Sequence, residues 1–271
     1  MEALHIENLV KKYFNFTLGP INLDLDAGYI VAVIGKNACG KSTLFNCMLG
    51  MESYDGICEW KGAGAAKVSQ SFAYVLERCP FPKEYSAKEI AECYSSFYRD
   101  FDMERYYTLL AKYNIPLGRS LRRLSRGSIM LVQMAFAFAY KSEVLFLDEA
   151  TAHLDSYARQ ELYNLISDYV AEGHMVFWSS HRMEELDRMA DYVLGIKKGQ
   201  QVLFGTREEI TERYHLIKGS SRQLDFINRS LIGRRDSEAG ASALVDTHRE
   251  YLKLGVYDEP AGLGDIVDYL L

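Results

Sequence analysis

The chain has 271 residues, of which 48% are hydrophobic and 25% charged, and its net charge is −6. This length and composition suit one large or two small globular domains with a buried core. The excess of acidic over basic residues disfavours a general nucleic-acid binder, because such a protein needs an excess of lysine and arginine to bind the phosphate groups. We therefore expect no nucleic-acid partner.

Two further observations bear on the cellular compartment. Five cysteines, from Cys39 to Cys93, form no C-x-x-C pair and no cluster with histidine, so reduced thiols in a cytosolic protein are the simplest interpretation. The N-terminus has no signal-peptide pattern. The longest apolar run covers residues 129–140 and contains Gln133, whereas a membrane helix needs about 20 apolar residues. If the protein works at a membrane, we expect a partner to supply the membrane spans.

The elements, in chain order, predict an α/β protein. Residues 4–34 read as β structure, in which Ile21, Leu23 and Leu25 alternate with polar residues. Residues 86–140 read as mostly helical, and Ser86 with Glu89 fits a capping box. We predict strands over 29–34, 56–61, 72–76, 143–147, 175–178, 192–196 and 201–204, and helices over 41–49 and 156–172. Residues 197–200 read as a hairpin turn, and residues 215–271 as a small α/β appendage without a catalytic pattern.

A phosphate-binding loop is predicted between the strand over 29–34 and the helix that follows. Residues 35–42 read Gly-Lys-Asn-Ala-Cys-Gly-Lys-Ser and fit the pattern G-x-x-x-x-G-K-[ST]. Such a loop wraps polyphosphate with backbone N–H groups, and the helix N-terminus adds positive potential. Lys41 is expected to reach the β- and γ-phosphates and Ser42 to coordinate Mg²⁺. The alternative is a purely structural glycine turn. The predicted nucleotide-binding residues here are Gly35, Asn37, Ala38, Cys39, Gly40, Lys41, Ser42 and Thr43.

Two acidic residues end the apolar strand over 143–147 and complete the predicted site. An acid at the carboxyl end of a central strand lies where α/β sheets bind ligands. Asp148 can hold Mg²⁺ through water, and Glu149 can orient or deprotonate the attacking water. His181 ends the next predicted strand, where it could sense the γ-phosphate. The alternatives are a solvated turn for the acids and a structural or surface role for the histidine.

At this point the chain resembles the ATP-binding-cassette (ABC) ATPases over about residues 1–215. Residues 124–128, Leu-Ser-Arg-Gly-Ser, resemble the family signature LSGGQ and end 20 positions before Asp148. Residues 152–155 resemble the D-loop, His181 the switch histidine and Tyr13 the aromatic residue that stacks on adenine. The resemblance implies a P-loop core with an antiparallel β subdomain and an inserted helical subdomain at about 84–140, followed by an appendage over 216–271.

The resemblance also implies a homodimer that sandwiches two ATP molecules. Ser125, Gly127 and Ser128 would then contact the γ-phosphate of the partner's ATP from a helix N-terminus, and Asp155 would act in the D-loop. The alternative for Ser125 is a plain helix N-cap, and for Tyr13 a packed strand tyrosine.

Four positions depart from the family pattern. Arg126 replaces the first glycine of the signature, Ser128 its glutamine, and Ala150 the proline after the catalytic acid. Glu77 stands where a glutamine that contacts the metal-bound water is expected. We expect Glu77 to take that place as a metal-site residue.

Residues 97–101, 109–110, 122–125 and 264–270 resemble the ATPases of bacterial ABC-2-type exporters, including those of the phenol-soluble modulin type. We therefore expect an ATPase that powers an exporter of peptide, drug or lipid-like cargo, bound to a separate transmembrane permease at the cytoplasmic face of the membrane. The alternatives are a soluble ABC-type ATPase and a nucleotide-dependent regulatory module without turnover. Glu149 and His181 favour turnover over the second alternative.

Overall fold

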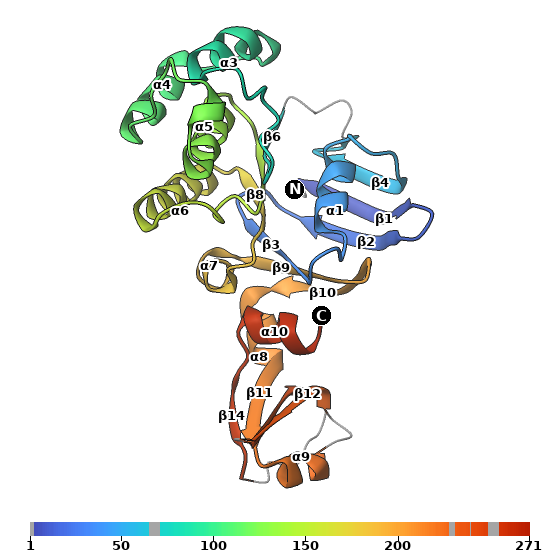
Figure 1. Ribbon diagram of the computed structural model, residues 1–271. Helices are drawn as coiled ribbons and strands as arrows, with labels where there is room; N and C mark the ends of the chain where they lie inside the picture. Colours follow the sequence, from blue (N-terminus) through green and yellow to red (C-terminus); the bar gives the residue numbers. More distant parts are fainter. Residues whose placement is uncertain (1–2, 65–70, 228–230, 239, 249–254) are drawn as a thin grey trace.

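The computed structural model describes residues 3–64, 71–227, 231–238, 240–248 and 255–271. These residues form three sheets, two of them in the main body and one in a C-terminal part that extends from it (Figure 1). The α/β class predicted from the sequence is confirmed. Among the described residues, no helix is long and apolar enough to cross a membrane.

The central sheet has six strands in the order β10-β9-β3-β8-β7-β6. All of its neighbouring pairs are parallel except β9 with β10, which are antiparallel. Three of its strands are buried along their whole length, which explains their continuous apolar sequence, because helices or another sheet cover both faces. The strands are β3 (Ile30–Ile34), β6 (Phe72–Val75), β7 (Val144–Asp148), β8 (Met175–Ser179), β9 (Tyr192–Lys197) and β10 (Gln200–Thr206).

A second, antiparallel sheet comes from the N-terminal part, in the order β2-β1-β4-β5. Its apolar face shares a core with helix α1 (Lys41–Met48) and with the central sheet, where the rings of Phe146 and Phe177 stack 5.3 Å apart. The strands are β1 (Leu4–Lys12), β2 (Thr17–Leu25), β4 (Asp55–Trp60) and β5 (Ala63–Gly64). Because β1 ends at Lys12, Tyr13 lies beyond it and is 44% exposed, so the packed strand tyrosine considered above is wrong.

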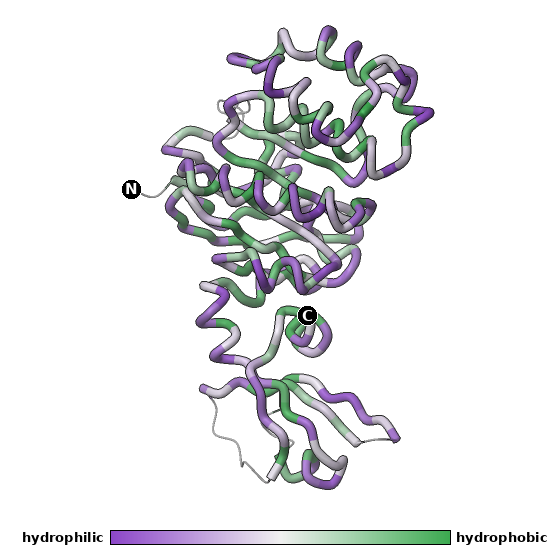
Figure 2. Tube along the Cα trace, turned by 90° about the vertical axis from the view of Figure 1, so that its left-hand side faces the viewer, coloured by the Kyte–Doolittle hydropathy of each residue, from purple (hydrophilic) through white to green (hydrophobic). Residues whose placement is uncertain are grey.

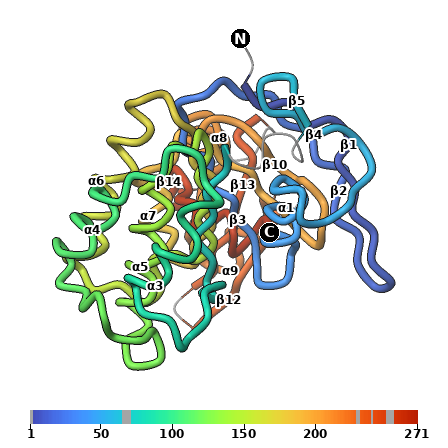
Figure 3. Tube along the Cα trace, turned by 90° about the horizontal axis from the view of Figure 1, so that it is seen from above, coloured from blue at the N-terminus to red at the C-terminus, as the bar shows by residue number. Residues whose placement is uncertain are grey.

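The helical region lies on the opposite side of the molecule from the N-terminal sheet (Figure 3). Its first helix begins at the predicted capping box, since Ser86 N donates to Glu89 Oε2 at 2.8 Å and Glu89 N to Ser86 Oγ at 3.3 Å. The apolar run around Gln133 is a buried helix of the globular core. The elements are α3 (Ala87–Tyr94), the 3-10 turns η2 (Ser95–Phe97) and η3 (Leu121–Arg123), α4 (Met103–Lys112) and α5 (Arg126–Phe138).

Two helices follow the ends of β7 and β8, α6 (Ser156–Ala171) and α7 (Met183–Met189). Helix α6 corresponds to the predicted helix over 156–172 and ends one residue earlier. The predicted turn between β9 and β10 is also present, with Lys198 and Gly199 at positive φ of 49° and 84°, as a tight hairpin requires.

The C-terminal part contains both strands and helices, in an antiparallel sheet of order β12-β13-β11-β14. Hydrophobic residues run along its strands, as they do in the main body (Figure 2). Leu216, Leu244, Leu263 and Ile266 belong to the same buried cluster as the main body, whereas the far side of this sheet has a small core of its own. The elements are α8 (Arg207–Arg213), β11 (Tyr214–Gly219), α9 (Ser221–Ile227), β12 (Leu231–Ser237), β13 (Gly240–Asp246), β14 (Tyr257–Pro260) and α10 (Leu263–Tyr269). The domain division at 215/216 stays a prediction.

Candidate nucleotide-binding and catalytic site

The predicted phosphate loop connects β3, which ends at Ile34, with α1, which begins at Lys41. Gly35 and Gly40 have φ of 153° and 116°, where a side chain is rarely tolerated. A Cβ on Gly35 would also lie 2.4 Å from the carbonyl oxygen of Ile196 in β9. The glycines at both ends of the loop therefore let the backbone turn sharply between a buried strand and a helix.

Lys41 contacts the phosphate loop, and Ser42 contacts the acidic strand β7. Lys41 is buried and its Nζ donates to the carbonyl oxygen of Gly35 at 2.9 Å. Ser42 Oγ donates to Asp148 Oδ2 at 2.7 Å. The structure therefore joins two motifs that lie 106 residues apart in the sequence.

Asp148 has a second partner that the sequence analysis missed. Ser179 Oγ donates to Asp148 Oδ1 at 2.5 Å. The two residues are direct neighbours in the parallel register of β7 and β8. A hydroxyl at the end of the strand next to the acidic strand was the available signal, but it becomes specific only when the strand order is known.

Glu149 and His181 meet at the carboxyl ends of the same two strands. Glu149 has φ of 53°, and its Oε2 accepts a hydrogen bond from the backbone N–H of His181 at 3.0 Å. The two side chains approach to 3.4 Å between Oε1 and Nε2. Burial raises the pKa of Glu149, while His181 and Lys41 oppose that rise. A partly buried carboxylate with a raised pKa, beside a histidine, is suited to accept a proton.

A second buried carboxylate, Glu185 in α7, connects the loops that follow β7 and β8. Its Oε2 accepts from Thr151 Oγ1 at 2.6 Å and from Ser180 Oγ at 3.3 Å. Its Oε1 lies 2.9 Å from Arg182 Nε and 3.4 Å from Arg159 Nε. Sequence reasoning missed Glu185 because no motif marks it, and only the fold shows that it lies between Glu149's loop and His181's loop.

The signature residues lie at the N-terminus of α5. Ser125 is the N-cap, and its Oγ accepts from Ser128 N at 3.1 Å, as the helix-cap alternative predicted. A Cβ on Gly127 would lie 2.6 Å from the carbonyl oxygen of His153, so this glycine allows a close contact with the predicted D-loop. Asp155 of that loop caps α6 by accepting from Ala158 N at 2.8 Å.

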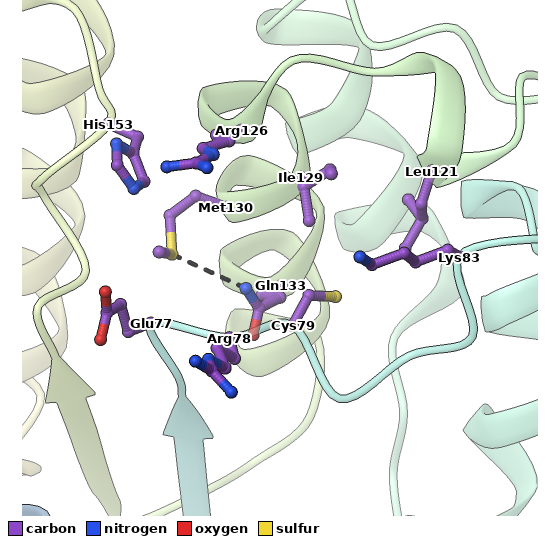
Figure 4. A pocket seen from close by; sticks show the side chains of 10 residues that line it. All are labelled: Glu77, Arg78, Cys79, Lys83, Leu121, Arg126, Ile129, Met130, Gln133 and His153. Atoms are coloured by element: carbon purple, nitrogen blue, oxygen red, sulfur yellow. Dashed lines mark hydrogen bonds between the residues drawn. The ribbon is translucent and has the colours of Figure 1, made fainter.

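Beside the signature there is a hollow of about 590 Å³, shown in Figure 4. Glu77 lines it, together with Arg126, His153 and the buried Gln133, whose Nε2 donates to the carbonyl oxygen of Leu76 at 3.2 Å. Among the described residues, no hydrogen bond joins Glu77 to Ser42 or Asp148. The predicted place of Glu77 at the metal site therefore stays a prediction.

A second groove, of about 280 Å³, lies between α1 and the helical region. Phe81 is half-buried there, with its ring 5.1 Å from that of Phe136 and 5.4 Å from that of Tyr94. Met51 lines the same groove and is 64% exposed. The remaining lining residues are Leu49, Phe72, Tyr74, Leu76, Pro80, Tyr98, Gln133, Ala137 and Tyr140.

A parallel sheet with a glycine-bounded phosphate loop and two acids on a neighbouring strand defines a P-loop nucleotide hydrolase. The family model described as "ABC transporter" matches residues 18–152. The chain belongs to the ABC transporter ATP-binding proteins. ATP-binding domains of this family are ATPases coupled to transport, so the chain is an ATPase.

Several named relatives are similar over about three quarters of this chain. ABC transporter ATP-binding protein YtrB of Bacillus subtilis is 26% identical over 212 residues, which cover 75% of this chain and 72% of YtrB. Lantibiotic transport ATP-binding protein SrtF of Streptococcus pyogenes is 28% identical, with 74% and 89% covered. Xylose import ATP-binding protein XylG of Shigella flexneri is 28% identical, with 76% of this chain but only 43% of XylG covered.

Solved structures have the same fold. A structure of the ATP-binding subunit of an ABC transporter is similar with a TM-score of 0.71 and 23% identity, and covers 78% of this chain and 92% of the other. A putative metal-chelate type ABC transporter in an inward-facing conformation is similar with a TM-score of 0.64 and 25% identity, with 91% and 98% covered.

The close approach of Gly127 to the D-loop can be tested by substitution. Gly127→Ala places a methyl group against a backbone carbonyl that cannot rotate away, so we expect a loss of about 1–3 kcal/mol in the free energy of unfolding. Urea unfolding of the purified chain measures it. Gly118→Ala is the matched control, because a Cβ there meets nothing within 4 Å. Equal stability of the two variants would contradict the packing role.

Proposed function

We propose that this chain is the motor subunit of an ABC exporter and works as a dimer that encloses two ATP molecules. The observation that carries the ATPase part is the meeting of Lys41, Ser42, Asp148, Glu149 and His181 at one edge of the central sheet. ABC ATP-binding subunits work with separate membrane permeases, and we place this chain at the cytoplasmic face of the membrane through such a permease.

The site has the oxygen donors that Mg²⁺ prefers. Ser42 Oγ and the carboxylate of Asp148 lie within 2.7 Å of each other, next to the phosphate loop. These two residues would hold the ion, with Glu77 as a further candidate. A bound Mg²⁺ would neutralise charge on the β- and γ-phosphates.

The chain's own residues then have separate tasks. Lys41 and the backbone N–H groups of residues 35–43 bind the phosphates, and the exposed ring of Tyr13 stacks on adenine. Glu149 accepts a proton from the attacking water, and His181 contacts the γ-phosphate. Glu149 is suited to this task because its Oε1 is buried and accepts no hydrogen bond from the described residues.

The signature completes the site in trans. Ser125 is exposed although it caps α5, so one side of this helix N-terminus faces outward. In the proposed dimer Ser125, Gly127 and Ser128 contact the partner's ATP, and Asp155 lies at the dimer interface. Capping and phosphate contact are compatible, because both use the same helix end.

The direction of transport rests on the resemblance to ABC-2-type exporters. The named relatives include both lantibiotic transport and sugar import proteins, so the export of a peptide, drug or lipid-like cargo is our proposal. The second candidate is a soluble ABC-type ATPase or a regulatory module that is not coupled to transport. ATPase activity that a membrane subunit does not change would favour it.

We further propose that the groove beside Phe81 receives a cytoplasmic helix of the membrane subunit. The groove is lined mainly by aromatic and aliphatic side chains, which favour apolar anchors. It also contains Leu76, the neighbour of Glu77, so a helix bound there would contact the segment next to the nucleotide site.

The catalytic assignment predicts different defects for two variants. Glu149→Gln should keep ATP binding but lower kcat by about 10²–10⁴-fold, because the amide cannot take the proton. Lys41→Ala should instead weaken ATP affinity by about 10–100-fold, since a charged phosphate contact is lost. Phosphate release and nucleotide titration measure the two effects. Near-normal hydrolysis by Glu149→Gln would remove Glu149 from this role.

If two subunits enclose ATP, the molar mass of the particle in solution should rise when nucleotide is added. Glu149→Gln with MgATP should run as a dimer in light scattering and as a monomer without nucleotide, because each ATP contacts both subunits. Adding Lys41→Ala to this variant should abolish the change. The same mass in all samples would contradict the ATP sandwich.

If a helix of the membrane subunit binds in this groove, substitutions there should uncouple ATP hydrolysis from transport. Met51→Lys adds a charge to an exposed groove residue without opening the core, so ATPase of the isolated chain should stay within about twofold while transport by the assembled complex falls. Phe81→Ala should have the same effect with some loss of stability, because its ring packs on Phe136. Phe226→Lys on the exposed face of α9 is the control. Equal transport by Met51→Lys and Phe226→Lys would refute the docking role.

A further inference from the structure

The C-terminal helix α10 lies next to the nucleotide site, although it is more than 200 residues from the phosphate loop in sequence. A hollow of about 620 Å³ separates the two. It is lined by residues of the phosphate loop, of the start of α7 and of α10, namely Gly35, Lys36, Asn37, His181, Met183, Glu184, Gly264, Val267 and Asp268. The C-terminal part therefore shares a boundary with the predicted catalytic histidine.

Helix α7 lies between the nucleotide site and α10 and carries two carboxylates with different partners. Glu185 is buried and Asp187 is half-buried. Glu185 binds Thr151 and Ser180, which are neighbours of the catalytic loops, as described above. Asp187 accepts a hydrogen bond from the backbone N–H of Leu263, the first residue of α10, at 3.0 Å to Oδ1 and 3.3 Å to Oδ2. Residues two positions apart on a helix are separated by about 200° around the helix axis, so they point to nearly opposite sides. Helix α7 is therefore held on one side by the catalytic loops and on the other by α10.

The contact between α7 and α10 is also apolar and firmly anchored. Leu186 of α7 and Leu263 and Ile266 of α10 are fully buried in the same core. The far end of α10 is fixed as well, because Lys197 Nζ of β9 donates to the carbonyl oxygen of Leu270 at 2.8 Å. Arg235 pairs with Asp268 at 2.9 Å and joins α10 to the C-terminal sheet. Helix α10 is thus held at both ends while it packs on α7.

The phosphate loop is held by different elements. The backbone N–H of Gly199, in the β9–β10 hairpin, donates to the carbonyl oxygen of Cys39 at 2.9 Å. A Cβ on Gly40 would lie 3.0 Å from side chains of Leu18 and Phe16. A change at α7 should therefore disturb His181 and Glu149 more than the residues that bind the phosphates.

We propose that Asp187 is a positioning residue for ATP hydrolysis, and that α10 controls turnover by holding α7. Through Asp187 the C-terminal part fixes α7, and through Glu185 α7 fixes the loops of Glu149 and His181. This inference rests on the proposed catalytic roles of Glu149 and His181 and gives a function to residues that carry no catalytic motif.

The first test separates turnover from binding. Asp187→Ala removes the acceptor of Leu263 N and should lower kcat of the full chain, alone and with its membrane subunit, by about three- to tenfold, with KM for ATP within about twofold. Asp187→Asn keeps an oxygen acceptor and should restore most of kcat. The control is Asp225→Ala in α9, which removes an ion pair with Arg234 of β12. Because α9 lies far from α7 (Figure 1), this variant should leave kcat unchanged. Equal losses in kcat and ATP affinity, or no loss at all, would overturn the proposal.

The second test asks whether Asp187 acts through His181. In a His181→Ala background, Asp187→Ala should reduce kcat by less than about twofold further, because residues that act in one network are not additive. Full additivity would mean that Asp187 acts elsewhere. Thermal unfolding of each variant checks that the fold is intact.

The third test does not depend on activity. In Glu149→Gln, MgATP should slow hydrogen exchange of the backbone amides in residues 263–269, because coupling between two sites is reciprocal. Asp187→Ala in the same background should remove this protection. Unchanged exchange in α10 on ATP binding would overturn the proposal, whereas failure of the proposed catalytic roles would appear as normal hydrolysis by Glu149→Gln itself.

Discussion

The candidate nucleotide site depends on the carboxylate of Asp148, which joins its elements. Asp148 is 7% exposed, and a carboxylate in such a place is tolerated only when its oxygens are hydrogen-bonded. Ser42 satisfies one oxygen from the first residues of α1, and Ser179 the other from the end of β8. Three elements far apart in the sequence therefore meet at one side chain. The positions of Glu149, which follows Asp148, and of His181, two residues after Ser179, depend on this meeting.

The loops that follow β7 and β8 are joined by a second link, the carboxylate of Glu185. A buried carboxylate needs partners as Asp148 does, and its partners are Thr151, Ser180, Arg159 and Arg182. The two acids thus connect different parts of the site. Asp148 connects the strand ends to the phosphate loop, whereas Glu185 connects the loops after the strands to α7. The positive φ of Glu149, 53°, is maintained because Asp148 before it and Thr151 after it are both hydrogen-bonded.

The sequence predicted the elements that local patterns define. The buried strands, the capping box at Ser86 and the phosphate loop each follow from residues close in the chain. It could not show Ser179 or Glu185, because their partners come from other elements and depend on strand order and helix placement. It could not show either that the ring of Phe81 packs on Phe136, because that residue comes from a helix more than 50 residues later. The position of α10 beside α7 could not be predicted either, because it depends on contacts between residues far apart in the sequence.

A motif match and a structural role can require the same residue, and Gly127 shows why this matters. A Cβ on Gly127 would lie 2.6 Å from the carbonyl oxygen of His153, which explains a glycine at this position within a single subunit. Ser125 is likewise explained as the N-cap of α5. A feature that is already explained within one subunit does not argue for a dimer. The signature therefore supports an ATP sandwich only through features that the single subunit does not require. The outward exposure of Ser125 is one such feature, and Arg126, also exposed at the same helix N-terminus, is another, because the phosphate of a second subunit's ATP would favour a positive charge there.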